Sequence, residues 1–118
     1  MALLRPSPEF ITQSLTHRTQ IVYHADISLL RALLDARPGR IICEAGTGSG
    51  SVSASLSRAL RPNGKLYTFE FHEERQKQAM ADFSSWIGSG SYGIFSVVFG
   101  FNLFFGRTFV SSVFTCIY

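Results

Sequence analysis

The chain has 118 residues and a net charge of +3, a size that suits one small domain. Hydrophobic residues make up 46% of it and charged residues only 16%, against about 25% in a typical soluble domain. This composition excludes a disordered charged chain, a collagen-like chain and a disulfide scaffold, and the length excludes a large self-sufficient enzyme. The charge is unevenly placed, because 18 of the 19 charged side chains lie in residues 1–83 and only Arg107 follows.

The charge excess and the cysteines restrict the function only weakly. Residues 1–83 carry ten Lys or Arg and eight Asp or Glu, so the excess permits nucleic-acid binding without requiring it. Cys43 and Cys116 share no metal-ligand spacing with the three histidines, so we expect no metal site and two reduced cysteines. Reduced cysteines are typical of proteins of the cytosol or the nucleus.

The predicted elements begin with an extended lead-in over residues 1–20, where two prolines disfavour a helix. A helix is expected from Asp26, as its N-cap, to Ala36, because isoleucine and leucine recur there at helical spacing. A short strand rich in β-branched residues follows over residues 40–44.

A glycine-rich turn comes directly after this strand and opens a second helix, expected over residues 51–60. A turn over 61–64 leads to a second strand over 65–71, and a charged helix is expected over 73–83. The order of strand, turn, helix and strand predicts a βαβ unit with a parallel sheet and a right-handed crossover. Two strands before residue 84 correspond to roughly the first third of a doubly wound sheet.

Residues 84–118 break this pattern, since they carry one charge and seven of the eleven phenylalanines. We expect an apolar tail unrelated to the preceding domain, such as translated intron or out-of-frame sequence. A membrane-spanning helix needs about 20 apolar residues, whereas the run 92–106 offers 15 before Arg107, so such a helix is disfavoured. The expected division is a lead-in over 1–20, a partial α/β domain over 21–83 and this tail.

The strongest motif is the turn Glu44-Ala-Gly-Thr-Gly-Ser-Gly50 between a strand and a helix. Its glycines allow a tight turn and close backbone contact with a ligand, and free N–H groups at the following helix can bind polar or anionic atoms. A dinucleotide-binding turn would need a third glycine where this chain has Ser51, and a phosphate-binding P-loop would need a lysine. An acid followed by G-x-G-x-G is instead typical of sites for S-adenosylmethionine (SAM).

Glu70 supports this interpretation, because it lies near the end of the second predicted strand, 20 residues after Gly50. A carboxylate at that position can accept hydrogen bonds from both ribose hydroxyls of a cofactor. The turn alone could be an ordinary tight turn, but the turn and Glu70 together predict a ribose-bearing cofactor. Arg75 is a further candidate, since it begins the helix just after Glu70.

The run His17-Arg-Thr-Gln-Ile-Val-Tyr23 is more specific than the glycine turn, because generic methyltransferases do not share it. Together with Ser7-Pro-Glu9, Arg37-Pro-Gly39, the glycine turn and Glu70-Phe-His72, it resembles the eukaryotic tRNA (adenine-N1)-methyltransferase catalytic subunit over about residues 5–83. The resemblance implies a partial Rossmann-like class I SAM-dependent methyltransferase fold. It also implies SAM as the cofactor and methyl transfer to N1 of the T-loop adenine 58 of tRNA.

The resemblance and the glycine turn imply two adjoining sets of site residues, because the sulfonium methyl must lie in line with the attacking adenine N1. The cofactor site would be lined by Val22, Gly46, Gly48, Ser49, Gly50, Ser51, Glu70 and Arg75. The set facing tRNA would be Gln20, Ile21, Val22, Tyr23, His24, Ala45, Thr47 and Val52. The family's catalytic aspartate lies beyond the matched residues, so no catalytic residue is expected in this chain.

The resemblance further implies two partners, tRNA and a related non-catalytic RNA-binding subunit, assembled as a heterotetramer in the nucleus. Three alternatives stay open. The chain could be a truncated product that only binds the partner subunit or tRNA, or a membrane-associated product of the apolar tail. An NAD-dependent oxidoreductase is a more distant alternative, disfavoured by Ser51.

Overall fold

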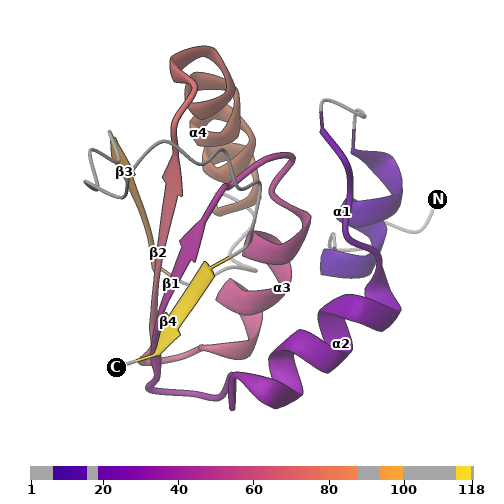
Figure 1. Ribbon diagram of the computed structural model, residues 1–118, viewed down its shortest axis with the longest axis vertical. Helices are drawn as coiled ribbons and strands as arrows, with labels where there is room; N and C mark the ends of the chain where they lie inside the picture. The colour runs from indigo at the N-terminus through magenta and orange to yellow at the C-terminus, as the bar shows by residue number, and fades with distance from the viewer. Residues whose placement is uncertain (1–6, 16–18, 88–93, 100–113, 118) are drawn as a thin grey trace, which may run out of the picture.

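The computed structural model describes residues 7–15, 19–87, 94–99 and 114–117 (Figure 1). In chain order the elements are α1 (Pro8–Ser14), α2 (His24–Leu33), β1 (Ile41–Ala45), α3 (Ser51–Ala59), β2 (Lys65–Glu70), α4 (Glu73–Ile87), β3 (Ile94–Phe99) and β4 (Phe114–Ile117). The expected α/β class is confirmed. None of the described helices is long and apolar enough to cross a membrane.

The strands form one sheet with the order β3-β2-β1-β4. β1 and β2 are parallel, with Ile41 opposite Lys65 and Ala45 opposite Phe69, so the predicted βαβ unit is present with α3 as its crossover. β3 pairs with β2 in parallel, and β4 pairs with β1 in the antiparallel direction. The carboxyl ends of β1 and β2 therefore meet at one edge, where open α/β sheets bind their ligands.

The core of the domain lies between the sheet and the helices, and Figure 1 shows α1, α2 and α3 on one side of the sheet. The central cluster joins α2, β1, α3 and β2 through Ile27, Ile42, Val52, Leu56, Leu60 and Leu66. Along α3 the buried side chains are mostly small: Ser51, Val52, Ser53, Ala54, Ser55 and Ser57. These small side chains let the neighbouring elements approach α3 closely.

Helix α1 corrects the expectation of an extended lead-in. The Ser7 side chain caps the helix, since its oxygen accepts a hydrogen bond from the Phe10 N–H at 3.2 Å. Pro8 lies in the first turn, where its missing N–H costs no helical hydrogen bond. Pro8 disfavours helix in the residues before it, but it is compatible with the first turn of α1 and therefore begins this helix. His17 and Arg18 of the specific run lie outside the described residues.

Helix α2 begins at His24, two residues before the expected N-cap, and ends at Leu33. Its N-cap is Tyr23, whose side chain makes no capping hydrogen bond. Asp26 lies instead inside the first turn, where its negative charge interacts favourably with the helix dipole. The chain leaves the helix through Asp35, which has a positive φ of 47°.

The segment after residue 83 contributes more to the fold than its sequence pattern predicts. α4 continues to Ile87 rather than ending at Phe83, and β3 and β4 occupy the two outer positions of the sheet. The run Ile94–Phe99 is rich in β-branched and aromatic residues, which favour a strand when a neighbouring strand is available. Most of the apolar run 92–106 lies outside the described residues, and a domain boundary at residue 84 stays a prediction.

Candidate functional site

The glycine turn, residues 46–50, connects β1 to α3 at the carboxyl edge of the sheet. The N–H groups of Gly46 and Thr47 both donate to the Phe69 carbonyl, at 2.8 and 3.1 Å, which fixes the turn to β2. Gly46, Gly48 and Gly50 have φ values of 91°, 55° and 84°. Because other residues adopt such φ values only with strain, the turn depends on glycine at these positions.

The two ends of the glycine turn differ in how closely they are packed. A Cβ added at Gly50 would lie 2.9 Å from the Phe83 ring and 3.2 Å from the Trp86 ring. A Cβ added at Gly46 would meet no atom within 4 Å in the part of the chain that the structure describes. We call the region around Gly50 the packed side of the turn and the region around Gly46 its open side.

Glu70, the last residue of β2, reaches the glycine turn. Its Oε2 accepts a hydrogen bond from the Gly48 N–H at 3.0 Å, and its Oε1 accepts one from the His72 N–H at 3.1 Å. The Arg75 Nε lies 3.4 Å from the same Oε1, and the Glu70 side chain is only 5% exposed. The acid and the turn, which are 22 residues apart in the sequence, therefore form one site.

Glu44, on β1, lies deeper and is 2% exposed. Burial raises the pKa of its carboxyl to about 7, hydrogen bonds from Ser53 and Thr68 oppose that rise, and the nearby charge of Glu70 adds to it. The Ser53 hydroxyl donates to Glu44 Oε2 at 2.5 Å, and Thr68 shares a 2.6 Å hydrogen bond with Thr47 of the turn. Glu44 thus belongs to a buried polar network under the turn. The sequence motif includes Glu44, but its pattern does not reveal this structural role.

The N-terminal segment lies against the turn and the first residues of α3 through hydroxyl groups. Thr19 Oγ1 shares a 2.9 Å hydrogen bond with Ser49 Oγ. The Ser51 hydroxyl donates to the Val22 carbonyl at 2.9 Å and shares a 2.8 Å hydrogen bond with Thr12. Sequence reasoning missed Thr12 and Thr19, because their partners are 39 and 30 residues away in the chain.

All the residues predicted to bind the cofactor are described, and the structure brings them to the carboxyl edge of the sheet. They are Val22, Gly46, Gly48, Ser49, Gly50, Ser51, Glu70 and Arg75. Val22 is half-buried and packs against the central cluster of the core. Their role in binding stays a prediction. Within the described ranges, His, Cys, Asp and Glu form no group that could hold a metal ion.

The residues predicted to face tRNA divide into two groups. Gln20, Tyr23 and His24 are exposed, and Val22 and Ala45 are half-buried. Ile21, Thr47 and Val52 are only 5%, 4% and 8% exposed. These three residues therefore present little surface to an RNA, and the whole assignment stays a prediction.

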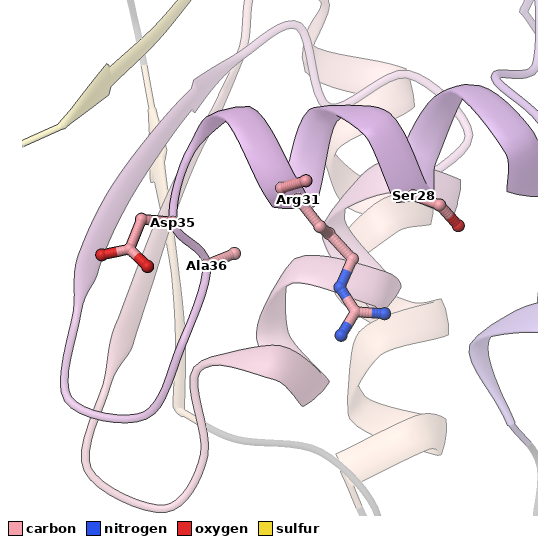
Figure 2. Close-up of a pocket in the computed structure, with 5 residues that line it drawn as sticks. Ser28, Arg31, Asp35 and Ala36 are labelled. Atoms are coloured by element: carbon pink, nitrogen blue, oxygen red, sulfur yellow. The ribbon is translucent and has the colours of Figure 1, made fainter.

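An open hollow of about 430 Å³ lies away from the glycine turn, along the C-terminal half of α2 (Figure 2). It is lined by Ser28, Arg31, Ala32, Asp35 and Ala36. None of these residues was predicted to be a site residue, and the hollow is not part of the candidate cofactor site.

Comparisons with known proteins identify the family of the chain. The family model described as "tRNA methyltransferase complex GCD14 subunit" matches residues 1–89. The chain is 49% identical over 83 residues to the tRNA (adenine(58)-N(1))-methyltransferase catalytic subunit TRM61 of Cryptococcus neoformans, which covers 70% of this chain and 19% of that protein. It is 48% identical over 81 residues to the corresponding subunit of Schizosaccharomyces pombe, which covers 69% of this chain and 22% of that protein.

A SAM-dependent O-methyltransferase of known structure from Thermotoga maritima is also similar. It superposes with a TM-score of 0.62 at 33% identity, over 77% of this chain and 34% of that chain. The chain thus spans about a fifth of the length of its curated relatives and about a third of this structural neighbour. The partial Rossmann-like methyltransferase fold and the family resemblance are both confirmed, and the chain belongs to the GCD14 family of tRNA methyltransferase complex subunits.

Proposed function

We propose that this chain is the SAM-binding part of a tRNA (adenine(58)-N(1))-methyltransferase catalytic subunit. The observation that carries the proposal is the 3.0 Å hydrogen bond from the Gly48 N–H to Glu70 Oε2, which holds an acid of the ribose-binding type against the glycine turn. The names of the curated relatives and of the Thermotoga maritima neighbour support the same chemistry.

The residues at this edge fit a nucleoside ligand. The open side of the turn leaves room beside the backbone of Gly46, since no atom of the described residues lies within 4 Å of a Cβ placed there. The Glu70 carboxylate is held against the same turn by the Gly48 N–H and would accept hydrogen bonds from the two ribose hydroxyls. Arg75 contacts Glu70 at 3.4 Å and would keep the carboxylate oriented. When bound, SAM supplies an electrophilic methyl group.

The proposal extends to the substrate and the partner. The substrate is tRNA, and the adenine to be methylated would have to leave its stacked position to reach the methyl group. The partner is a non-catalytic RNA-binding subunit in a nuclear heterotetramer, in keeping with a family whose description names a complex. Because the chain spans about a fifth of its relatives, the proposal assigns cofactor binding to it rather than the complete reaction.

A binding experiment on the 118-residue chain tests the cofactor site. SAM binding would be measured by ligand-observed NMR for the unaltered chain, for Glu70→Gln and for Glu73→Gln. Glu73 is a matched control, because it is an exposed glutamate three residues further along that pairs with Lys77 at 2.7 Å. We expect weak binding that falls at least about tenfold in Glu70→Gln, since hydrogen bonds to a charged acceptor contribute about 1.5–3 kcal/mol each. Equal binding by Glu70→Gln, or no binding by the unaltered chain, would contradict the proposal.

A chimera tests the activity. Residues 5–83 of this chain would replace the matching segment of the Schizosaccharomyces pombe subunit, and methyl transfer from labelled SAM to tRNA would be followed. We expect the chimera to methylate adenine 58, and the Glu70→Gln change within it to lower kcat/KM at least about tenfold while Glu73→Gln leaves it unchanged. A folded chimera that binds tRNA without methylating it would favour the alternative of a chain that only binds.

A further inference from the structure

Positive charge gathers at the amino edge of the sheet, opposite the glycine turn. Arg40 immediately precedes β1 and Lys65 begins β2, and the Lys65 N–H donates to the Arg40 carbonyl at 3.0 Å. The Arg40 N–H in turn donates to the Arg37 carbonyl at 3.2 Å. Gly64, in the turn that carries Arg61, packs so closely on this edge that an added Cβ would lie 2.6 Å from the Arg40 carbonyl.

We define the basic edge as Arg37, Arg40, Arg61 and Lys65. It holds four of the eight Lys and Arg side chains in the described residues, but only one of the eight described acids, Asp35. The other seven acids lie elsewhere on the molecule. The described domain is therefore positive at its amino edge, while acids outnumber Lys and Arg in the rest of it. Such an uneven distribution of charge directs an anionic partner to one end of the protein.

The one acid at the basic edge is already engaged. Asp35 Oδ2 lies 2.5 Å from Arg40 Nη2 and 2.8 Å from Arg37 Nε. The hydrogen bond from Arg40 holds the pKa of Asp35 below its usual value, so the carboxylate stays charged at neutral pH and neutralises at most one guanidinium. Arg61 and Lys65 are exposed, and among the described residues neither has an acidic partner.

Arg31 extends this surface onto α2. It lines the hollow at the C-terminal half of the helix, and its Nε is buried without a hydrogen-bond partner among the described residues. In Figure 2 the Arg31 guanidinium and the Asp35 carboxylate project away from each other, so Asp35 does not form an ion pair with Arg31. A planar guanidinium carries several N–H donors in a geometry that suits phosphate oxygens.

We propose that the basic edge, together with Arg31, binds the phosphate backbone of tRNA. The choice of tRNA as the anion rests on the proposed function. Five residue steps of β2 separate Lys65 from Glu70, a distance of about 17 Å at about 3.3 Å per residue. A contact so far from the cofactor site cannot touch the reacting base, but it can hold the body of a folded RNA, since phosphate contacts position an RNA without reading its sequence.

The test is tRNA binding by the 118-residue chain, followed by fluorescence anisotropy at several salt concentrations. Lys65→Gln and Arg61→Gln each remove one exposed cation that has no acidic partner among the described residues. Lys77→Gln is the matched control, because Lys77 is an exposed lysine on α4, away from the amino edge, and pairs with Glu73 at 2.7 Å. We expect Lys65→Gln and Arg61→Gln each to weaken binding about fivefold to tenfold near 0.1 M salt and to reduce the slope of log K against log salt by about 0.7 to 0.9. Lys77→Gln should stay within about twofold of the unaltered chain.

Three results would overturn the inference: no tRNA binding by the unaltered chain, equal weakening by Lys65→Gln and Lys77→Gln, or binding to anionic phospholipid vesicles as tight as binding to tRNA. SAM binding measured on the same samples separates this inference from the proposed function. Loss of tRNA binding with SAM binding intact in the Lys65→Gln variant supports the basic edge. A chain that binds tRNA through this edge but fails to bind SAM would contradict only the proposed cofactor site.

Discussion

The packed side and the open side of the glycine turn come from one short motif, yet their surroundings differ. On the packed side, the rings of Phe83 and Trp86 approach Gly50. On the open side, no described atom lies within 4 Å of a Cβ added at Gly46, and the N–H of the next glycine, Gly48, donates to Glu70, which also meets the Arg75 guanidinium. The comparison teaches that the packed side fixes the turn to the domain, while the open side supplies the polar groups for a ligand.

The largest expected effect comes from substituting the two outer glycines. Gly50→Ala combines about 1–2 kcal/mol of left-handed backbone strain with about 1–3 kcal/mol of overpacking against Phe83 and Trp86. Gly46→Ala carries the strain alone, because its Cβ would meet no described atom within 4 Å. Urea unfolding of both variants measures the difference in the free energy of unfolding. Equal losses would show that the turn has no packed side.

Glu44, in the buried polar network under the turn, makes the stability of the domain depend on pH. Its pKa of about 7 in the folded protein is higher than the ordinary value of 4.5, so the folded state holds a proton that the unfolded state releases. The free energy of unfolding should therefore fall by up to about 3 kcal/mol as the pH rises from about 4.5 through 7, since one pKa unit corresponds to about 1.4 kcal/mol. Unfolding at pH 5 and pH 8 measures this fall. Glu44→Gln, which cannot ionise, should remove most of it, and an unchanged fall in this variant would disprove the assignment.

Ser53→Ala tests whether the hydroxyl groups stabilise the buried carboxyl. It removes the 2.5 Å donor to Glu44 and should lower the free energy of unfolding by about 1–3 kcal/mol. It should also raise the pKa of Glu44, so that the pH-dependent loss of stability moves to higher pH. Ser55→Ala is the control, because Ser55 is also a buried serine of α3, two residues after Ser53. It should change stability by less than about 0.5 kcal/mol. Equal losses in both variants would mean that this hydrogen bond has no special importance.

The smallest effect on stability is expected on the open side. Arg75→Gln removes a 3.4 Å ion pair whose arginine side chain is 35% exposed, and such pairs contribute less than about 1 kcal/mol. Thermal unfolding should therefore barely change, whereas SAM binding should weaken because Glu70 loses its orienting partner. A stability loss as large as that of Gly50→Ala would erase the distinction between the two sides.

The sequence predicts the centre of the fold well, because local signals are sufficient there. The bounds of β1, α3 and β2 differ from the expected ranges by only one residue at any end, since β-branched runs and the glycine turn mark them. The Glu70 position was also predictable, because an acid at the end of the second strand of a βαβ unit necessarily lies beside the first turn.

The remainder depends on contacts between distant segments. β3 and β4 have no helical or alternating pattern, and they are strands because β2 and β1 offer edges for pairing. The burial of Glu44 follows from the packing of α3 over β1, which a motif cannot reveal. The unpartnered Nε of Arg31 and the basic edge likewise appear only once the amino ends of two strands are brought together.

Ser51 occupies the position of the third glycine of a dinucleotide-binding turn, and its hydroxyl joins α1 to the chain just before α2. The Ser51 hydroxyl forms hydrogen bonds with the Thr12 hydroxyl and the Val22 carbonyl, and Ile11 packs against Ala54 of α3 in the same region. Because these contacts link the three segments to one another, α1, the segment at Val22 and the first turn of α3 should open as one cooperative unit. Amide hydrogens in all three would then exchange with solvent at a common rate, rather than fraying one by one from the N-terminus.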